Sequence, residues 1–182
     1  MKTESAVTYI LRLALTLLII TAVVAVALAA VNKITAPIIT RRNAEKTQLA
    51  IQAVLPGGGE SVDFTDSTGL VTHVYKGEQG YAVEVVPQGF NGAITMMVGV
   101  DFQGNVQGIS VINQTETAGL GAICGASNSA GDNFRNQFIG MTGTLAVDKD
   151  GGQGDVITGA TITSRAVTAG VNAALDCVEN LD

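Results

Sequence analysis

Four hydroxyl side chains crowd one short turn near the C-terminus, where their types and spacing suit the binding of an anion. They are Thr158, Thr161, Thr163 and Ser164. The turn lies between a glycine-rich run and a helical pattern whose apolar face continues to Val178. A loop that enters a helix presents unpaired backbone N–H groups and the positive end of the helix dipole, which together stabilise a phosphate. Because Ser and Thr are also common helix N-caps, a plain capping turn is the alternative.

The nine residues Asp155–Thr163 read Asp-Val-Ile-Thr-Gly-Ala-Thr-Ile-Thr and resemble the flavinylation motif of the FMN-binding domain. That domain occurs in the G subunit of the Rnf ion-pumping electron-transport complex and in the C subunit of the sodium-pumping NADH:quinone reductase. In this family a flavin transferase attaches FMN, through its phosphate, to the last Thr of the Thr-Gly-Ala-Thr sequence. The resemblance therefore implies that Thr161 carries FMN through a phosphoester bond.

The resemblance also implies roles for the neighbours of Thr161. Gly159 and Ala160 allow the transferase to approach closely, and Asp155 and Thr158 complete the turn that it recognises. Arg165 follows one helical turn later and is expected to pair with the phosphate. The cofactor-binding residues expected in this segment are Asp155, Thr158, Gly159, Ala160, Thr161, Thr163 and Arg165.

A second segment, Glu116–Gly121, resembles the Glu-Thr-Pro-Gly-Leu-Gly sequence of the same family, with Ala118 in place of the usual Pro. Its two glycines let the backbone come close to a flat ligand, and Leu120 is able to lie against the face of that ligand. The resemblance implies that Glu116, Thr117 and Leu120 line the flavin ring. A plain glycine turn is the alternative. The segment lacks the third glycine and the βαβ unit of a dinucleotide-binding fingerprint.

Composition argues against nucleic-acid and metal partners. The chain has a net charge of −6, no Trp and 4% aromatic residues, so it lacks the basic patches and stacking platforms that nucleic acids require. His73 is the only histidine and there is no Cys-x-x-Cys pair, so no zinc or iron–sulfur site is expected from this chain alone. Cys124 and Cys177 are expected to be buried free thiols, with a disulfide as the alternative. A place for Cys124 near the flavin or a neighbouring protein of a complex stays open.

The uncharged stretch Leu13–Val31 predicts one transmembrane helix after a short cytoplasmic N-terminus, residues 1–12. A helix of this length spans roughly 28 Å, close to the hydrocarbon core of a bilayer. A signal peptide cleaved near Ala27-Leu28-Ala29 is the alternative. The resemblance places the following domain on the extracytoplasmic side, although the basic residues after the stretch do not favour that orientation. Those residues are Lys33, Arg41, Arg42 and Lys46.

Residues 32–60 are predicted to form a juxtamembrane helix and a linker. Pro37 is expected to end the apolar helix, and Thr40 is expected to cap a second helix that runs to about Val54. The sequence Leu-Pro-Gly-Gly-Gly that follows Val54 then predicts a stop.

Residues 61–182 are predicted to form the extracytoplasmic FMN-binding domain, of the α+β class, in which an antiparallel β-meander sheet packs with helices. Alternating residues and short glycine turns predict its strands at Leu70–Tyr75, Tyr81–Val86, Ala93–Val100 and Val106–Ile112. Asp132–Ile139 predicts a short helix and Thr144–Asp148 a last strand. The run Gly89–Gly104 also resembles the FMN-binding family, so the resemblance extends well beyond one motif.

The resemblance implies a membrane-anchored flavoprotein that transfers electrons as part of an Rnf-type complex. Such a complex couples electron transfer between ferredoxin and NAD⁺ to Na⁺ or H⁺ translocation. The implied partners are other membrane subunits, the flavin transferase during maturation, and the lipid bilayer. No catalytic residues are visible, so a complete active site is not expected in this chain alone. The alternatives are a stand-alone anchored FMN carrier for an extracytoplasmic reductase and a membrane-tethered binding module without redox chemistry.

Overall fold

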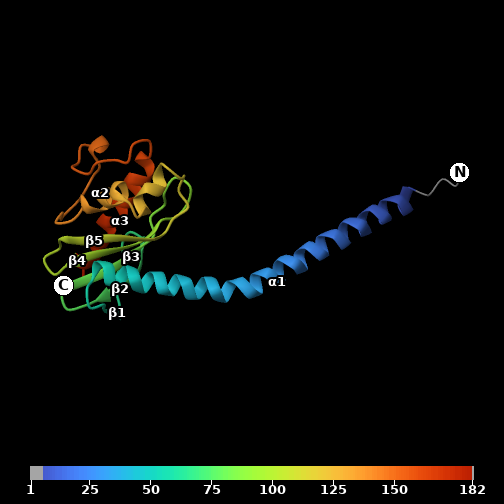
Figure 1. Cartoon of the computed structure of the whole chain (residues 1–182), viewed down its shortest axis with the longest axis horizontal. Coiled ribbons are helices and arrows are strands. Elements are labelled where there is room, and N and C mark those ends of the chain that lie inside the picture. Colours follow the sequence, from blue (N-terminus) through green and yellow to red (C-terminus); the bar gives the residue numbers. More distant parts are fainter. Residues whose placement is uncertain (1–5, 182) are drawn as a thin grey trace. The chain divides into compact units, whose positions relative to one another are not determined.

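The computed structural model describes residues 6–181, and the chain divides into two compact units, one up to Ala44 and one from Glu45 onward (Figure 1). Lys2 and the other residues before Ala6 in the predicted N-terminal segment lie outside the described residues, as does Asp182. The unit from Glu45 onward contains the sheet and all of the shorter helices.

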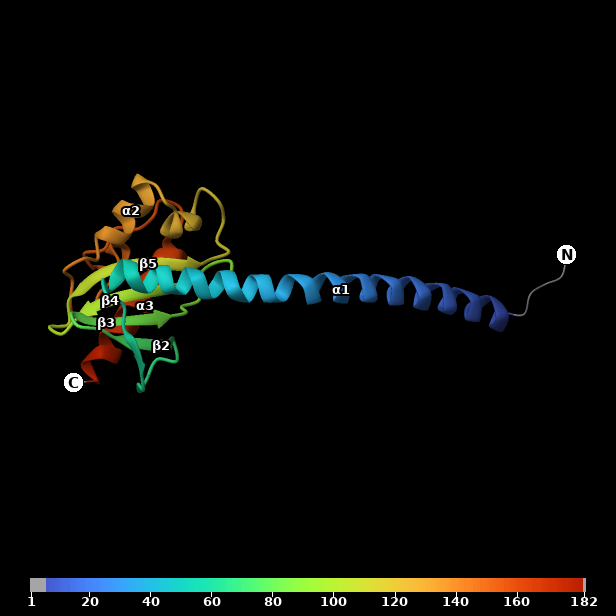
Figure 2. The same cartoon turned by 60° about the horizontal axis from the view of Figure 1, so that its bottom comes forward.

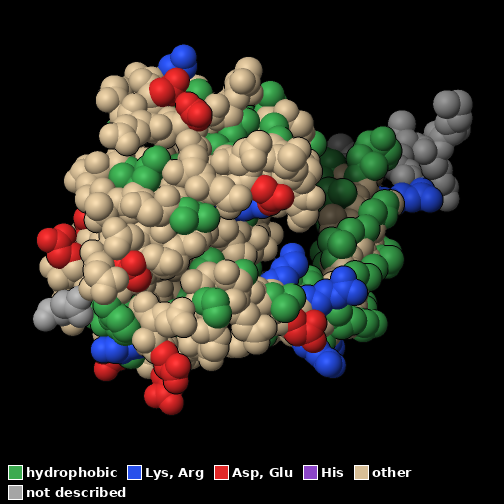
Figure 3. Space-filling model, turned by 60° about the vertical axis from the view of Figure 1, so that its left-hand side comes forward, with side chains coloured by type: hydrophobic (Ala, Val, Ile, Leu, Met, Phe, Trp, Pro, Cys, Tyr) green, Lys and Arg blue, Asp and Glu red, His purple; other side chains and the backbone are tan. Residues whose placement is uncertain are grey.

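The first element, α1, runs from Ala6 to Val54 and is long and apolar enough to cross a membrane. From Tyr9 to Leu49 its large apolar side chains are exposed, and Figure 3 shows hydrophobic side chains along much of this helix beside several charged ones. The prediction of an N-terminal membrane-spanning helix is therefore consistent with the length, composition and exposure of α1.

The prediction that Pro37 ends the first helix is wrong, because α1 continues through it. Thr40 does not cap a new helix, since its hydroxyl donates to the carbonyl of Ala36, one turn earlier, at 3.1 Å. Proline removes one backbone donor and crowds the preceding turn. Here strong helix formers such as Ala, Glu, Lys, Gln and Leu follow the proline and sustain the helix up to Val54, where the predicted stop is confirmed.

Five antiparallel strands form one sheet in the order β1-β2-β3-β4-β5, which confirms the predicted meander and the α+β class. The strands are β1 (Glu60–Val62), β2 (Val71–Lys76), β3 (Gly80–Val85), β4 (Thr95–Asp101) and β5 (Val106–Asn113). β1 was not predicted. It is short and mostly exposed, so it lacks the apolar alternation by which the other strands are recognised.

Both faces of the sheet are covered. On one face α3 (Thr161–Glu179) packs its buried residues Val167 and Val171 into a core with Val83 and Val98. On the other face Ile51 and the rest of the last turns of α1 pack against Ala82 and Met97 (Figure 2). Buried on both sides, β3 and β4 read as nearly continuous apolar runs.

The segment between β5 and α3 contains α2 (Ser129–Asn136) and two 3₁₀ helices, η1 (Gly121–Gly125) and η2 (Asp148–Asp150). The predicted helix Asp132–Ile139 lies earlier in the structure, as α2. It begins at Ser129, because the Asn128 side chain caps it by accepting from the Gly131 N–H at 3.0 Å, and it ends at Asn136. The predicted strand Thr144–Asp148 is wrong. It makes a single parallel bridge, from Val147 to Gly154, before the chain turns into η2.

Candidate functional site

The hydroxyl-rich turn forms the start of α3, which begins at Thr161. The residue before it, Ala160, has no polar side chain, and within residues 6–181 no side chain caps this helix end. The first N–H groups of a helix have no partner inside the helix. The start of α3 therefore offers backbone donors and a positive dipole end to an anion.

Next to this helix end lies a pocket of about 380 Å³, within the size range of small-molecule sites. Its walls come from the β3–β4 loop, the β5–η1 loop and the start of α3. The lining residues are Phe90, Glu116, Thr117, Leu120, Gly121, Gly159, Ala160, Thr161, Ile162 and Thr163. Three of them are large apolar side chains that stay exposed: Phe90, Leu120 and Ile162.

Glu116 joins these three walls. Its buried carboxylate accepts from the backbone N–H groups of Phe90 and Asn91, with N···O distances of 3.3 Å and 2.8 Å. It also accepts from the hydroxyl of Thr163 in the first turn of α3. Glu116 therefore ties the loop that carries Phe90 to the start of α3.

Two glycines let the walls approach each other. A Cβ on Gly121 would lie 2.5 Å from Oγ1 of Thr163 and 2.6 Å from Oε2 of Glu116, so these two side chains would have to shift to accommodate it. Gly159 has a φ of +77°, a backbone conformation that favours glycine. In this fold, the glycines of the two motifs let neighbouring protein segments approach each other closely.

The four hydroxyls of the turn have different surroundings. Ser164 is fully buried, accepts from the Ile157 N–H at 2.9 Å and donates to the Ala160 carbonyl at 3.1 Å. Thr163 donates to Glu116. Thr158 is exposed and lies outside the pocket, whereas Thr161 is half-buried in its wall.

Most of the residues predicted for the site lie together in this pocket. They are Glu116, Thr117, Leu120, Gly159, Ala160, Thr161 and Thr163. Asp155 and Thr158 instead line a neighbouring pocket of about 570 Å³ beside α2. The backbone of Asp155 is held there by the side-chain amide of Gln137, which accepts at 2.5 Å and donates at 3.1 Å.

Arg165 also lies outside the pocket lining. Its guanidinium forms two hydrogen bonds to the carboxylate of Asp150 in η2, at 2.7 Å and 2.6 Å. This pairing holds the pKa of Asp150 below its ordinary value and raises the pKa of Arg165. The guanidinium is engaged with a carboxylate 15 positions earlier in the chain.

Two lining residues were not expected from the sequence, Phe90 and Ile162. Ile162 stands inside the Asp155–Thr163 motif, so its position carried a signal that was not used. Phe90 stands between Gly89 and Asn91 in a turn, inside the run Gly89–Gly104 that resembles the family, but that resemblance did not mark it as a lining residue.

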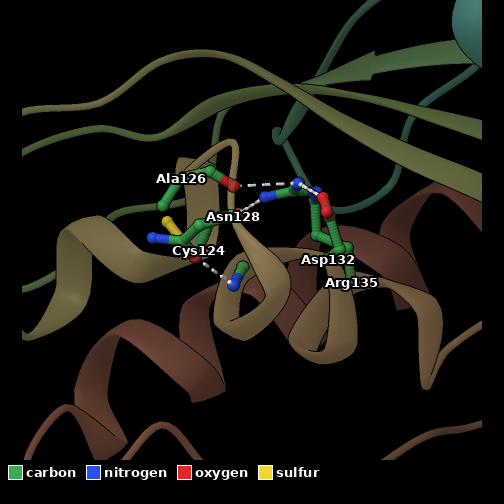
Figure 4. Close-up of polar contacts among 6 residues, drawn as sticks. Cys124, Ala126, Asn128, Asp132 and Arg135 are labelled. Atoms are coloured by element: carbon green, nitrogen blue, oxygen red, sulfur yellow. Dashed lines mark hydrogen bonds and ion pairs between the residues drawn. The ribbon is translucent and has the colours of Figure 1, made fainter.

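Cys124 and Cys177 are both free and buried, as predicted. Burial, and next the charge of Glu116, raise the pKa of the Cys124 thiol to about 11. Cys124 does not line the pocket. It lies in η1, where Arg135 of α2 donates to the carbonyls of Cys124 and Ala126, at 2.7 Å and 3.0 Å, and pairs with Asp132 (Figure 4).

Comparison with known proteins gives one family and a set of full-length relatives. The family model of the FMN-binding domain matches residues 89–176, which include every residue that lines the pocket. The G subunit of the Na⁺-translocating ferredoxin:NAD⁺ oxidoreductase complex of Acetobacterium woodii is 33% identical over 94% of this chain and 93% of its own length.

Two further relatives agree. The G subunit of the ion-translocating oxidoreductase complex of Methanosarcina acetivorans is 32% identical over 93% of this chain and 94% of its own length. The protein of the same name from Yersinia pestis is 46% identical over 55% of this chain and 51% of its own length. The chain therefore belongs to the FMN-binding domain family that includes the G subunits of the ion-translocating oxidoreductase complexes.

Proposed function

We propose that this chain is an electron-transfer subunit of an ion-translocating oxidoreductase complex and carries FMN joined through its phosphate to Thr161. The names of its full-length relatives support the complex, and the FMN-binding domain supports the cofactor. The observation that carries the attachment site is the position of Thr161. It is the first residue of a helix without a side-chain cap within residues 6–181, and it lies in the wall of the pocket.

The residues of the pocket fit the two ends of FMN. The uncapped start of α3 provides N–H donors for phosphate oxygens. Phe90, Leu120 and Ile162 provide apolar surface for a flat ring, and Gly121 and Gly159 leave room for the walls to close on it. FMN, when bound, supplies the one- and two-electron chemistry, and the protein holds and tunes it.

The surroundings of the four hydroxyls favour Thr161 as the attachment residue. Attachment replaces the hydroxyl hydrogen with the phosphoryl group, so the oxygen must be accessible. The Ser164 oxygen is buried between two backbone partners, and the Thr163 hydroxyl is bonded to Glu116. Thr158 is accessible but lies outside the pocket. Thr161 alone among them combines access with a place in the wall.

We further propose that residues 13–31 span the membrane, that residues 1–12 are cytoplasmic, and that residues 32–60 connect the anchor to an extracytoplasmic domain of residues 61–182. The exposed apolar surface of α1 supports the anchor. The partners are then lipid, the other membrane subunits of the complex, and a flavin transferase during maturation. An alkaline phosphatase fused after Asp182 tests the orientation, since it is active only outside the cytoplasm.

The intact mass of the protein purified from its native membrane tests the attachment. We expect an added mass equal to FMN less one water, lost in Thr161→Ala and kept in Thr161→Ser. Thr142→Ala is the matched control, because Thr142 is exposed and lies outside the pocket lining. An added mass that persists in Thr161→Ala would overturn the site.

The same preparation separates the alternative functions. If the wild-type protein lacks the added mass in a membrane that flavinylates other proteins, the electron-carrier function is wrong and a tethered binding module remains. Flavin-loaded protein that purifies without multi-span membrane subunits, under detergent conditions that preserve such complexes, would instead indicate a stand-alone carrier.

A further inference from the structure

Glu116 is a buried carboxylate in the pocket, with its side chain at the junction of three segments. Glu116 is only 8% exposed, yet it lines the pocket wall. Every hydrogen bond to its carboxylate in the described structure comes from an N–H or a hydroxyl, and no Lys or Arg of residues 6–181 forms an ion pair with it. The negative charge is therefore solvated by donors without being cancelled by a cation.

Two glycine-containing backbone segments approach this carboxylate closely. A Cβ on Gly89 would lie 2.6 Å from Oε1, and a Cβ on Gly121 would lie 2.6 Å from Oε2. Glycine at both positions thus lets two backbone segments close on the carboxylate. Its backbone is fixed as well, because the Glu116 N–H donates to the side-chain oxygen of Gln114 at 2.6 Å.

The charge acts on groups around it. After burial, the Glu116 charge is the largest cause that raises the pKa of the Cys124 thiol, because it disfavours a second negative charge nearby. The same electrostatic rule applies to any group in the pocket that gains negative charge. Reduction adds electrons, so a carboxylate in the pocket wall makes reduction of a bound group less favourable.

We propose that Glu116 is a positioning residue that fixes the Phe90 loop against the start of α3, and that its charge lowers the reduction potential of the flavin held in the pocket. The effect of the charge on the reduction potential rests on the proposed function, because it requires a bound flavin. The positioning role of Glu116 concerns the protein alone. The hydrogen bonds to Phe90 and Asn91 reach over 26 and 25 positions of the chain, so they set the tertiary place of the loop.

Glu116→Gln separates the two roles. A glutamine oxygen is able to accept from the Asn91 N–H, and its amide is able to donate to Thr163, whose hydroxyl then accepts. The variant thus removes the charge and keeps the hydrogen bonds with Asn91 and Thr163, although the weaker one from the Phe90 N–H, at 3.3 Å, is lost. Glu116→Ala removes the charge and all three hydrogen bonds. Glu84→Gln is the matched control: it makes the same change in charge in β3, at a carboxylate that lies outside the pocket and next to His73.

The test measures the midpoint potential of the flavin in full-length protein from the native membrane, after intact mass has established the loading of each sample. We expect a shift to more positive potential in Glu116→Gln and no shift in Glu84→Gln. Equal potentials in loaded wild type and Glu116→Gln would overturn the role of the charge. Wild-type protein without the added mass would overturn the proposed function, and the role of the charge with it.

Amide hydrogen exchange tests the positioning role without flavin, in the Thr161→Ala background. We expect faster exchange of the Asn91 N–H in Glu116→Ala and wild-type-like exchange in Glu116→Gln. Thermal unfolding shows whether the alanine variant is folded. If it is not folded, the glutamine variant is compared with Glu116→Met, which fills similar space without hydrogen bonds. Unchanged Asn91 exchange in the folded variant that lacks the hydrogen bonds would overturn the positioning role.

Discussion

Gly159 and Leu120 both line the pocket, and they lie so close that a methyl group on the glycine would press on the leucine side chain. A Cβ on Gly159 would lie 3.1 Å from Cδ2 of Leu120, and Gly159 itself has a φ of +77°. We expect Gly159→Ala to cost about 1–2 kcal/mol of unfolding free energy from the left-handed backbone. It should also displace Leu120 and reduce flavin loading, as measured by urea unfolding and intact mass.

Gly151→Ala is the control for this substitution. Gly151 has a φ of +83°, and a Cβ there would meet nothing within 4 Å among the described residues. It should carry a similar backbone cost and leave the pocket unchanged. If both variants lose flavin to the same extent, the contact with Leu120 is not what matters.

The hydrogen bonds from Arg135 to the carbonyls of Cys124 and Ala126 should stabilise the folded protein. Arg135→Met keeps most of the aliphatic length and removes the donors to the Cys124 and Ala126 carbonyls. We expect a loss of about 1–3 kcal/mol in unfolding free energy, because two partly buried acceptors lose their partner. Arg165→Met provides the comparison. Its ion pair with Asp150 is solvent-exposed and screened by water, so we expect a clearly smaller loss of unfolding free energy. Equal losses would contradict this difference.

The pair Asp150–Arg165 predicts a specific acid response. The hydrogen bonds from Arg165, and then its charge, hold the pKa of Asp150 below its ordinary value. A carboxyl whose pKa is lower in the folded state adds stability above its unfolded pKa, and this contribution is lost as the pH falls through the folded value. An NMR titration should therefore show the pKa of Asp150 rising in Arg165→Ala. The same titration curve in both proteins would rule out this coupling.

The two cysteines should be unreactive in the native protein. Both are buried, and the pKa of Cys124 is raised to about 11, so at neutral pH its thiol is protonated as well as inaccessible. We expect an alkylating reagent to label neither thiol in buffer and both in concentrated urea, with the count read from intact mass. Unfolded protein that stays unlabelled until a reductant is added would reveal a disulfide.

The sequence predicted the parts of this fold in which local pattern and tertiary environment agree. Alternation and glycine turns placed β2 to β5, and the apolar face of α3 was visible from Val167 to Val178. The helix end predicted at Pro37 was wrong, because good helix formers that follow the proline outweigh its local cost. Thr144–Asp148 misled because its apolar residues pack as a loop, and neighbouring glycines let that loop fold back on itself.

The site divides in the same way. Two sequence motifs supplied most of the pocket lining, since each places its residues within a few positions of one another. The place of Phe90 depends on hydrogen bonds to Glu116, and a contact over that separation leaves no local pattern. Arg165 shows that local spacing can also suggest a partner different from the one that the structure shows. Its spacing from Thr161 suggested a phosphate partner, whereas its geometry is set by Asp150 in a turn whose position only the fold determines.

The position of Thr161 at the start of α3 also has a mechanical consequence. The helix runs 19 residues, and its buried face is held in the core by residues such as Val171 and Leu175. A group bonded to the side chain of Thr161 is therefore attached to a rigid helix that the core holds in place. Thermal motion of that group would then come from rotation about the few single bonds that join it to the backbone, while α3 itself stays fixed. Any change in its reach toward a partner would require the whole domain to move.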